Sequence, residues 1–232
     1  MKAIILAAGL GSRLGKVTSN NHKSLIKLGK KTILGRLVEQ FEACGIKNIQ
    51  IICGHQKKKI DKKFANYKTF YYPKYKTTNN LHTLYYFKKL LNDDCIISFA
   101  DIVLDKKIIR RLINVKKKIT LCIDTLQYRK GTMKIDLYKD QIKYIGNSPK
   151  TKSGNYIGIL KIKKKSLKSF ISSMKELLKK SNNFYFTEAI NLMINKKYSK
   201  INYLDVRKKF WFEIDNYNDL TYARKKINAI EN

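Results

Sequence analysis

The sequence predicts an α/β protein with a three-layer, Rossmann-like arrangement, in which helices cover both faces of a mixed, mostly parallel sheet. Its first half alternates short apolar runs with segments of helical period, beginning with the strand-like run Lys2-Ala3-Ile4-Ile5-Leu6. Residues 33–44 then carry a helical apolar stripe that Gly45 ends. This alternation is typical of strand-helix-strand units, in which a crossover helix joins two parallel strands.

The later apolar patterns extend this arrangement. Further strands of the parallel part are expected at 48–53, 69–72 and 95–100, and helices at 56–64 and 81–91. Strand-like pieces joined by short polar connections follow at 119–123, 134–137, 141–145 and 156–162, and they predict a small β extension of the sheet. The last elements expected are helices at 167–178, 188–194 and 216–227 and a strand at 201–204. No linker or repeat divides the pattern, so residues 1–232 are expected to form one domain.

The composition is strongly basic, with 50 Lys and Arg against 17 Asp and Glu and a net charge of +33. A charge of this size attracts polyanions, so a nucleic-acid-binding module is one alternative. The lysines are spread along the whole chain, however, which favours a solvated basic surface without a specific nucleic-acid partner. The four scattered cysteines are expected to be reduced thiols, mostly buried. Without a stretch that could span a bilayer, the protein is expected to be cytoplasmic.

The opening strand runs directly into the loop Ala7-Ala8-Gly9-Leu10-Gly11-Ser12-Arg13-Leu14. Glycines let the backbone approach an anion and direct N–H groups at it, while Arg13 and Lys23 supply positive charge. A dinucleotide fold would have a third glycine where Leu14 stands, and the P-loop pattern is absent from the sequence. The loop therefore predicts a polyphosphate site of another kind.

Leu6-Ala7-Ala8-Gly9-x-Gly11-Ser12-Arg13-Leu14, with Lys23-Ser24-Leu25 downstream, resembles the nucleotidyltransferases that join a nucleoside triphosphate to a sugar phosphate or an alcohol phosphate. The resemblance implies the nucleotide-diphospho-sugar transferase type of fold, with residues 8–13 around the triphosphate and Lys23 at the reacting phosphates. One departure is His22, because the family usually has proline there. Either the loop is less rigid in this chain, or His22 adds a hydrogen bond of its own.

The segment Thr77-Thr78-Asn79-Asn80-Leu81-His82-Thr83-Leu84 resembles one that lies beside the nucleotide in the phosphocholine cytidylyltransferases. In a purely structural interpretation, Thr78 or Asn79 caps the following helix. Both interpretations are compatible, since an asparagine amide also suits the edge of a pyrimidine base. The nucleotide-binding set implied by the resemblance is Leu6, Ala7, Ala8, Gly9, Gly11, Ser12, Arg13, Lys23, Asn79 and Asn80.

Asp101 follows a wholly apolar strand, so it is expected on the sheet edge that also carries Gly9 and Gly54. The alternative role of a helix cap is open, although Asp105 is better placed for it. The surroundings of Asp101 resemble the family's metal-binding segment, and Trp211-Phe212-Glu213-Ile214-Asp215 resembles the segment whose last aspartate completes a magnesium site. An edge strand followed by a helix capped by Asp215 is the alternative there. The resemblance thus implies Mg²⁺ on Asp101 and Asp215, and a catalytic set of Arg13, Lys23, Asp101 and Asp215.

The resemblance implies phosphocholine as the preferred acceptor, with CTP as the nucleotide and CDP-choline and pyrophosphate as products. A quaternary ammonium binds aromatic faces and carboxylates, which Trp211 and Glu213 offer. The full acceptor-binding set expected from the sequence is Tyr85, Lys134, Tyr156, Tyr185, Glu188, Trp211 and Glu213. A second departure lies near Ile145, where the family commonly has a lysine and this chain offers Asn147 and then Lys150.

Other functions stay open at this point. One is nucleotidyl transfer from UTP, dTTP or GTP to a sugar 1-phosphate, and another is transfer from CTP to a different phosphorylated alcohol or phosphonate. Outside the enzymes, the alternatives are a nucleotide sensor and a nucleic-acid-binding module. The sequence does not indicate an oligomeric state.

Overall fold

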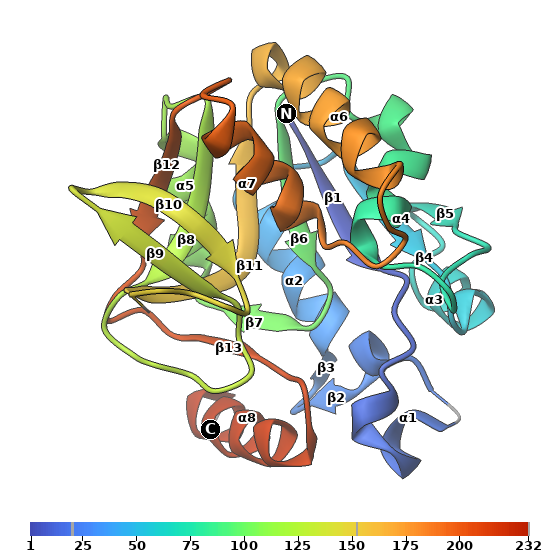
Figure 1. The fold of residues 1–232 in the computed structure, drawn as a ribbon. Helices are drawn as coiled ribbons and strands as arrows, with labels where there is room; N and C mark the ends of the chain where they lie inside the picture. The colour runs from blue at the N-terminus through green and yellow to red at the C-terminus, as the bar shows by residue number, and fades with distance from the viewer. Residues whose placement is uncertain (20, 152, 232) are drawn as a thin grey trace.

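The computed structural model describes residues 1–19, 21–151 and 153–231 (Figure 1). Its strands are β1 (Lys2–Ala7), β2 (Lys27–Leu28), β3 (Lys31–Thr32), β4 (Ile49–Cys53), β5 (Lys68–Tyr71), β6 (Cys95–Phe99), β7 (Ile102–Leu104), β8 (Ile119–Asp124), β9 (Lys134–Tyr138), β10 (Gln141–Gly146), β11 (Gly154–Ile162), β12 (Ile201–Asp205) and β13 (Trp211–Glu213). Its α-helices are α1 (Lys16–Ser19), α2 (Ile33–Ala43), α3 (Lys57–Lys63), α4 (Asn80–Tyr86), α5 (Lys106–Asn114), α6 (Lys164–Leu178), α7 (Phe186–Asn195) and α8 (Tyr217–Glu231). Short 3-10 turns are η1 (Ser12–Leu14), η2 (Lys23–Leu25) and η3 (Lys88–Leu90).

The main sheet runs in the order β10-β9-β11-β6-β1-β4-β5, with β8 and β12 continuing it beside β11. β1 pairs in parallel with both β4 and β6, and β5 pairs in parallel with β4. β11 is antiparallel to β6, to β8 and to β9, so the β extension joins the parallel part through β11. The predicted fold class, a mixed sheet with a parallel centre, is confirmed.

Side chains of successive strand residues point to opposite faces of the sheet, which divides the core in two. On one face, Ile4 and Leu6 of β1 share a cluster with residues of α4, α6 and α7. On the other face, Ala3 and Ile5 share a cluster with residues of α2, α3 and α5. Figure 1 shows these helices on the two sides of the sheet, as the sequence pattern predicted.

The last helix, α8, lies below the carboxyl end of β1 and near β2, as Figure 1 shows. Leu220 and Ala223 of α8 belong to a third apolar cluster together with Ile214 and with Leu14 of the glycine loop. Leu14 is 4% exposed. The end of the loop is therefore anchored by burial, while the part before it stays open.

Several local features differ from the sequence-based expectation. The helix expected at 81–91 ends at Tyr86, and the 3-10 turn η3 follows. β7 and the β2/β3 pair were not predicted, because strands of two or three residues are too short to show a period. Cys53, Cys95 and Cys122 are buried free thiols, whereas Cys44 is partly exposed. Within the described residues, the helices are all too short or too polar to cross a membrane.

Candidate active site

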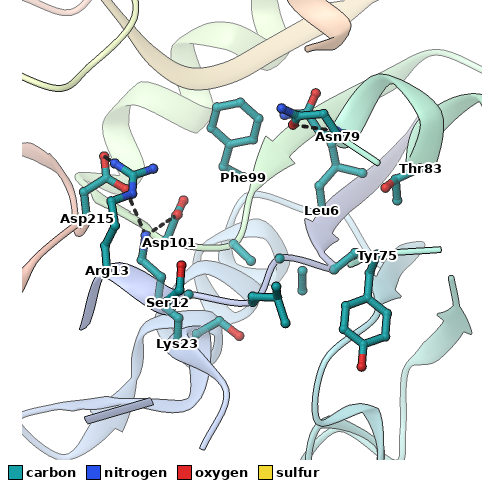
Figure 2. A pocket seen from close by; sticks show the side chains of 18 of the residues that line it. Leu6, Ser12, Arg13, Lys23, Tyr75, Asn79, Thr83, Phe99, Asp101 and Asp215 are labelled. Carbon is teal, nitrogen blue, oxygen red and sulfur yellow. Dashed lines mark hydrogen bonds and ion pairs between the residues drawn. The ribbon is translucent and has the colours of Figure 1, made fainter. Parts of the chain in front are cut away.

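A cavity of about 440 Å³ opens at the carboxyl ends of β1 and β6 (Figure 2). The residues that line it are Leu6, Ala7, Ala8, Gly9, Leu10, Gly11, Ser12, Arg13, His22, Lys23, Ser24, Tyr75, Thr78, Asn79, Asn80, Thr83, Phe99, Ala100, Asp101, Gly131, Met133, Asn147, Tyr185, Glu213 and Asp215. Figure 2 shows Arg13, Lys23, Asp101 and Asp215 on one side and Asn79, Thr83 and Tyr75 on the other. All residues of the predicted nucleotide-binding and catalytic sets meet here, and their roles stay predictions.

Glycine is required at two points where the loop packs against its neighbours. Gly11 has φ +67°, and a Cβ added to it would lie 3.0 Å from Cβ of Lys23. Gly54, which follows β4, lies so close to the loop that an added Cβ would be 2.5 Å from the carbonyl oxygen of Ala8. The absence of a side chain at both positions lets the loop lie against the lysine-bearing turn and the end of β4.

Lys23 lies between two carboxylates. Its Nζ is 2.7 Å from Oδ2 of Asp101 and 3.1 Å from Oδ1 of Asp215, and Lys23 is mostly buried. Arg13 lies 3.5 Å from Oδ2 of Asp215, but it is largely exposed. Burial alone would lower the pKa of Lys23, yet the charges and hydrogen bonds of Asp101 and Asp215 outweigh it and raise the pKa above its ordinary value. Lys23 is therefore a fixed cation at neutral pH.

The short pair β7/β13 brings the distant carboxylates together. Glu213 of β13 stands opposite Ile102 of β7, and the backbone N–H of Ile214 donates to the carbonyl of Asp101 at 3.0 Å. Asp101 directly precedes β7 and Asp215 follows β13, so the two residues lie side by side, although 113 residues lie between them in the sequence.

Both alternatives based on helix capping are resolved by the hydrogen bonds. Asp105 caps α5 by accepting from the N–H of Lys107 at 2.8 Å, which leaves Asp101 without that role. At the start of α8, Asn216 and Asp219 cap one another, with Oδ1 of Asn216 accepting from the N–H of Asp219 at 3.0 Å. The interpretation of Asp215 as the cap of the last helix is therefore wrong, and its carboxylate faces Lys23 instead.

Glu213 adds a third carboxylate to this side of the cavity. One oxygen from each of Asp101, Glu213 and Asp215 lies within 4.8 Å of the others. Burial, together with the charges of the two aspartates, raises the pKa of Glu213 to about 8. In addition, Oδ1 of Asp101 is buried and has no hydrogen-bond partner among the described residues. Crowded carboxylates with an unpaired oxygen match the oxygen ligands that Mg²⁺ prefers, so this donor set fits a divalent cation.

The paired asparagines line the cavity and also cap two helices. Oδ1 of Asn79 accepts from the N–H of Asn80 at the start of α4, which confirms the predicted cap. Oδ1 of Asn80 accepts from the N–H of Phe186 at the start of α7, at 2.8 Å. Asn80 therefore links the start of α4 at the cavity to the helix that begins beside Tyr185.

Only some of the predicted acceptor-binding residues lie at the cavity. Tyr185 and Glu213 line the cavity, whereas Tyr85, Lys134, Tyr156, Glu188 and Trp211 are not among the described residues that do. Nε1 of Trp211 donates to Oδ2 of Asp124 at 2.7 Å, and the guanidinium of Arg129 lies over the indole. Trp211 is thus engaged in the core beneath the site.

The other four residues outside the cavity also have local partners. Lys134 donates to the carbonyl of Thr132 at 2.7 Å and to Oδ1 of Asn155 at 2.9 Å. Tyr156 is 1% exposed and packs edge-on against Phe99, while Glu188 accepts from Asn191 on the same helix. Tyr85 accepts from Nζ of Lys88 at the surface of α4.

Several cavity residues were not predicted as site residues, notably Tyr75, Thr83, Phe99, Met133 and Asn147. Phe99 was recognisable in principle, because it stands two residues before Asp101 at the end of β6. Asn147 was noted only as a departure from the family pattern. Tyr75 lies in a turn and Met133 directly before β9, both outside periodic segments, so only tertiary contacts bring them to the cavity.

Comparisons with known proteins show the family of this chain. The sequence profile of the MobA-like NTP transferase domain matches residues 3–131, which is more than half of the chain. The chain is 27% identical to the CTP:phosphoglutamine cytidylyltransferase of Campylobacter jejuni over 261 aligned residues, with 97% of this chain and 100% of the relative covered. It is 38% identical to the choline-phosphate cytidylyltransferase of Streptococcus pneumoniae over 112 residues, which cover 47% and 48% of the two chains.

Two solved structures share the fold. The CTP:phosphocholine cytidylyltransferase from Streptococcus pneumoniae aligns with a TM-score of 0.82 at 22% identity, over 97% of this chain and 98% of that one. The inositol-1-phosphate CTP transferase from T. maritima also has a TM-score of 0.82, at 16% identity, over 98% and 96% of the two chains. With the profile match, these findings show that the chain belongs to the MobA-like NTP transferase family and is a nucleotidyltransferase with cytidylyltransferases among its relatives.

Proposed function

We propose that this protein transfers a cytidylyl group from CTP to a phosphorylated small-molecule alcohol, with Mg²⁺ as cofactor and phosphocholine as the preferred acceptor. The products are CDP-choline and pyrophosphate. The observation that carries the proposal is the convergence of the glycine loop, Lys23 and the carboxylates of Asp101, Glu213 and Asp215 in one cavity. CTP as the nucleotide is supported by the cytidylyltransferases among the relatives.

The reaction needs positioning and charge stabilisation more than acid–base catalysis. A phosphate oxygen of the acceptor attacks the α-phosphorus of CTP in line, the bond to the β-phosphate oxygen breaks, and pyrophosphate leaves with the electron pair. The attacking phosphate is already an anion, so no residue has to deprotonate it. Arg13, Lys23 and the N–H groups of the loop hold the triphosphate against the repulsion between the two anions.

The carboxylates of Asp101, Glu213 and Asp215 are the residues that would hold Mg²⁺. The metal ion supplies charge neutralisation and orientation of the phosphates when it is bound. Lys23 stands between two of these carboxylates, 2.7 Å from Asp101, so its ammonium lies in the same cavity that would hold the triphosphate. The same cluster therefore carries both the cation for the triphosphate and the oxygen ligands.

The cavity supports phosphocholine through Phe99 and Tyr185, because aromatic faces attract a quaternary ammonium. A second candidate is an acceptor whose head group forms hydrogen bonds. Asn147 favours it, because its amide lines the cavity while Trp211 is engaged elsewhere. The phosphoglutamine named for the Campylobacter jejuni relative is an acceptor of this kind.

A pyrophosphate-release assay with Mg²⁺ tests the proposal. CTP, UTP, dTTP and GTP are each combined with phosphocholine, phosphoglutamine or glucose 1-phosphate, and the Asp101→Asn variant serves as the inactive control. We expect release with CTP and phosphocholine. Release with CTP and phosphoglutamine alone would select the second candidate. Release only with a sugar 1-phosphate, or with a nucleotide other than CTP, would reject the proposed function.

A further inference from the structure

His22 stands directly before Lys23 and is 3% exposed. It caps the turn η2, because its Nδ1 accepts from the backbone N–H of Ser24 at 3.2 Å and lies 2.8 Å from Oγ of the same serine. Its carbonyl accepts from the N–H of Leu25 at 2.8 Å. His22 therefore stabilises the turn that carries Lys23 through both its side chain and its backbone carbonyl.

These contacts identify the tautomer of the ring. A backbone N–H can only donate, so the Nδ1 that accepts from Ser24 carries a lone pair. In the neutral ring the proton must then be on Nε2. Burial, reinforced by His55 after β4, lowers the pKa of His22 to about 4, against the opposing effects of Asp101 after β6 and of the carbonyls of Gly9 and Ala7. The ring is therefore a neutral Nε2–H donor at neutral pH.

His22 lines the cavity together with Ala7 and Gly9 of the glycine loop. Nε2 is buried, and among the described residues no atom accepts its hydrogen with full hydrogen-bond geometry. The backbone carbonyls of Gly9 and Ala7 are nevertheless near enough to act on the pKa of the ring. A buried N–H without an acceptor is costly, so a hydrogen bond from Nε2 to one of these carbonyls would be favoured.

We propose that His22 is a positioning residue for the nucleotide: its Nδ1 fixes the Lys23 turn, while its Nε2–H holds the carbonyl side of the loop at Ala7 and Gly9. In a planar trans peptide the C=O and the following N–H point in opposite directions. Holding the carbonyl of Gly9 toward His22 therefore keeps that oxygen away from the triphosphate and turns the N–H of Leu10 away from His22. Carbonyl oxygens repel phosphates and N–H groups attract them, so this orientation favours the triphosphate.

The inference rests on the proposed nucleotide site. Two substitutions of His22 separate the roles of its two ring nitrogens. His22→Asn keeps an acceptor at the place of Nδ1 but loses the donor at Nε2. His22→Gln keeps a donor near the place of Nε2 but loses the cap. Binding of CTP with Mg²⁺ is measured by calorimetry in the absence of acceptor, the melting temperature is measured for each variant, and the ¹⁵N shifts of His22 report the tautomer in the wild type.

We expect His22→Asn to melt near the wild-type temperature and to bind CTP more weakly, on the order of tenfold, which corresponds to one hydrogen bond. We expect His22→Gln to melt at a lower temperature but to bind CTP within about threefold of the wild type. A proton on Nδ1 in the ¹⁵N spectrum overturns the inference, as does unchanged CTP binding by His22→Asn. If the wild type binds no nucleoside triphosphate, the proposed function fails as well, so the two failures are distinguishable.

Discussion

Nζ of Lys23 lies 2.7 Å from Oδ2 of Asp101, in the middle of the carboxylates that the site offers to a metal ion. The same ammonium lies 3.1 Å from Oδ1 of Asp215. Mg²⁺ and the ammonium of Lys23 would repel one another strongly in this space, because Lys23 is mostly buried and its charge is poorly screened by solvent. Lys23 therefore neutralises these carboxylates, and under the proposed function Mg²⁺ and this ammonium would compete for them.

Replacing Lys23 with methionine is expected to separate metal binding from catalysis. Without the competing ammonium, Lys23→Met should bind Mg²⁺ more tightly, on the order of tenfold by calorimetry. Its metal-free melting temperature should fall, because Asp101 and Asp215 lose their counter-ion, and added Mg²⁺ should raise it more than in the wild type. Turnover should drop at least about 100-fold, because the triphosphate loses its cation.

Lys57→Met is the matched control, since Lys57 pairs with Asp61 on α3, outside the cavity. We expect this variant to bind Mg²⁺ and to turn over like the wild type. If Lys23→Met bound Mg²⁺ more weakly than the wild type, Lys23 would not compete with the metal ion.

Replacement by asparagine should have different effects at the two neighbouring aspartates Asp101 and Asp105. Asp101→Asn removes a carboxylate from the cluster, so Mg²⁺-dependent turnover should fall by about 100-fold or more while the protein stays folded. Asp105→Asn leaves a good helix cap on α5, so both turnover and melting temperature should stay near the wild type. Pyrophosphate release and circular dichroism check both. Normal Mg²⁺-dependent turnover of Asp101→Asn would exclude Asp101 as a ligand.

Gly11→Ala should harm nucleotide binding as well as stability. Gly11 has φ +67°, and the new Cβ would lie 3.0 Å from Cβ of Lys23, so the lysine turn must shift. Gly45→Ala is the control, because Gly45 has φ +84° with no atom within 4 Å of the added Cβ. Both variants should lose about 1–2 kcal/mol of unfolding free energy, but only Gly11→Ala should raise KM for CTP. Equal KM values in the two variants would show that the packing on Lys23 is unimportant.

The free energy of unfolding should fall at acidic pH because His22 becomes protonated. Its pKa is about 4 in the folded protein and 6.5 in the unfolded chain, so between these values the unfolded chain binds a proton that the folded protein does not. The contribution of His22 to the free energy of unfolding is fully present above pH 6.5. It is lost as the pH falls to about 4, a change of roughly 3 kcal/mol. Urea unfolding from pH 4 to 7 should therefore show a smaller loss for His22→Asn than for the wild type. Parallel curves would refute the low pKa.

Much of the fold was predictable because the apolar period is a local property. The strands at 48–53 and 95–100 and the helix at 33–44 were expected within one or two residues of β4, β6 and α2. The glycine loop was recognisable too, since its residues are contiguous and its chemistry depends on their order. Asp101 and Asp215 were identified separately by the segments around them.

Side-chain direction was not predictable in the same way. Trp211 was expected to bind the acceptor, but its indole donates to Asp124 in the core, while Glu213 two positions later reaches the cavity. The role of His22 depends on Ser24 and on the loop carbonyls, which a sequence motif cannot place at hydrogen-bond distance.

The sequence by itself determined the strand and helix order, the glycine loop and the identities of the charged residues, because each depends on neighbours along the chain. Only the tertiary structure decided which charges meet. The pairing of β7 with β13 brings Asp101, Glu213 and Asp215 within 4.8 Å of one another and places Lys23 among them. Electrostatic energy depends on distance in space, so the chemistry of this site arises from contacts between segments that are remote in sequence.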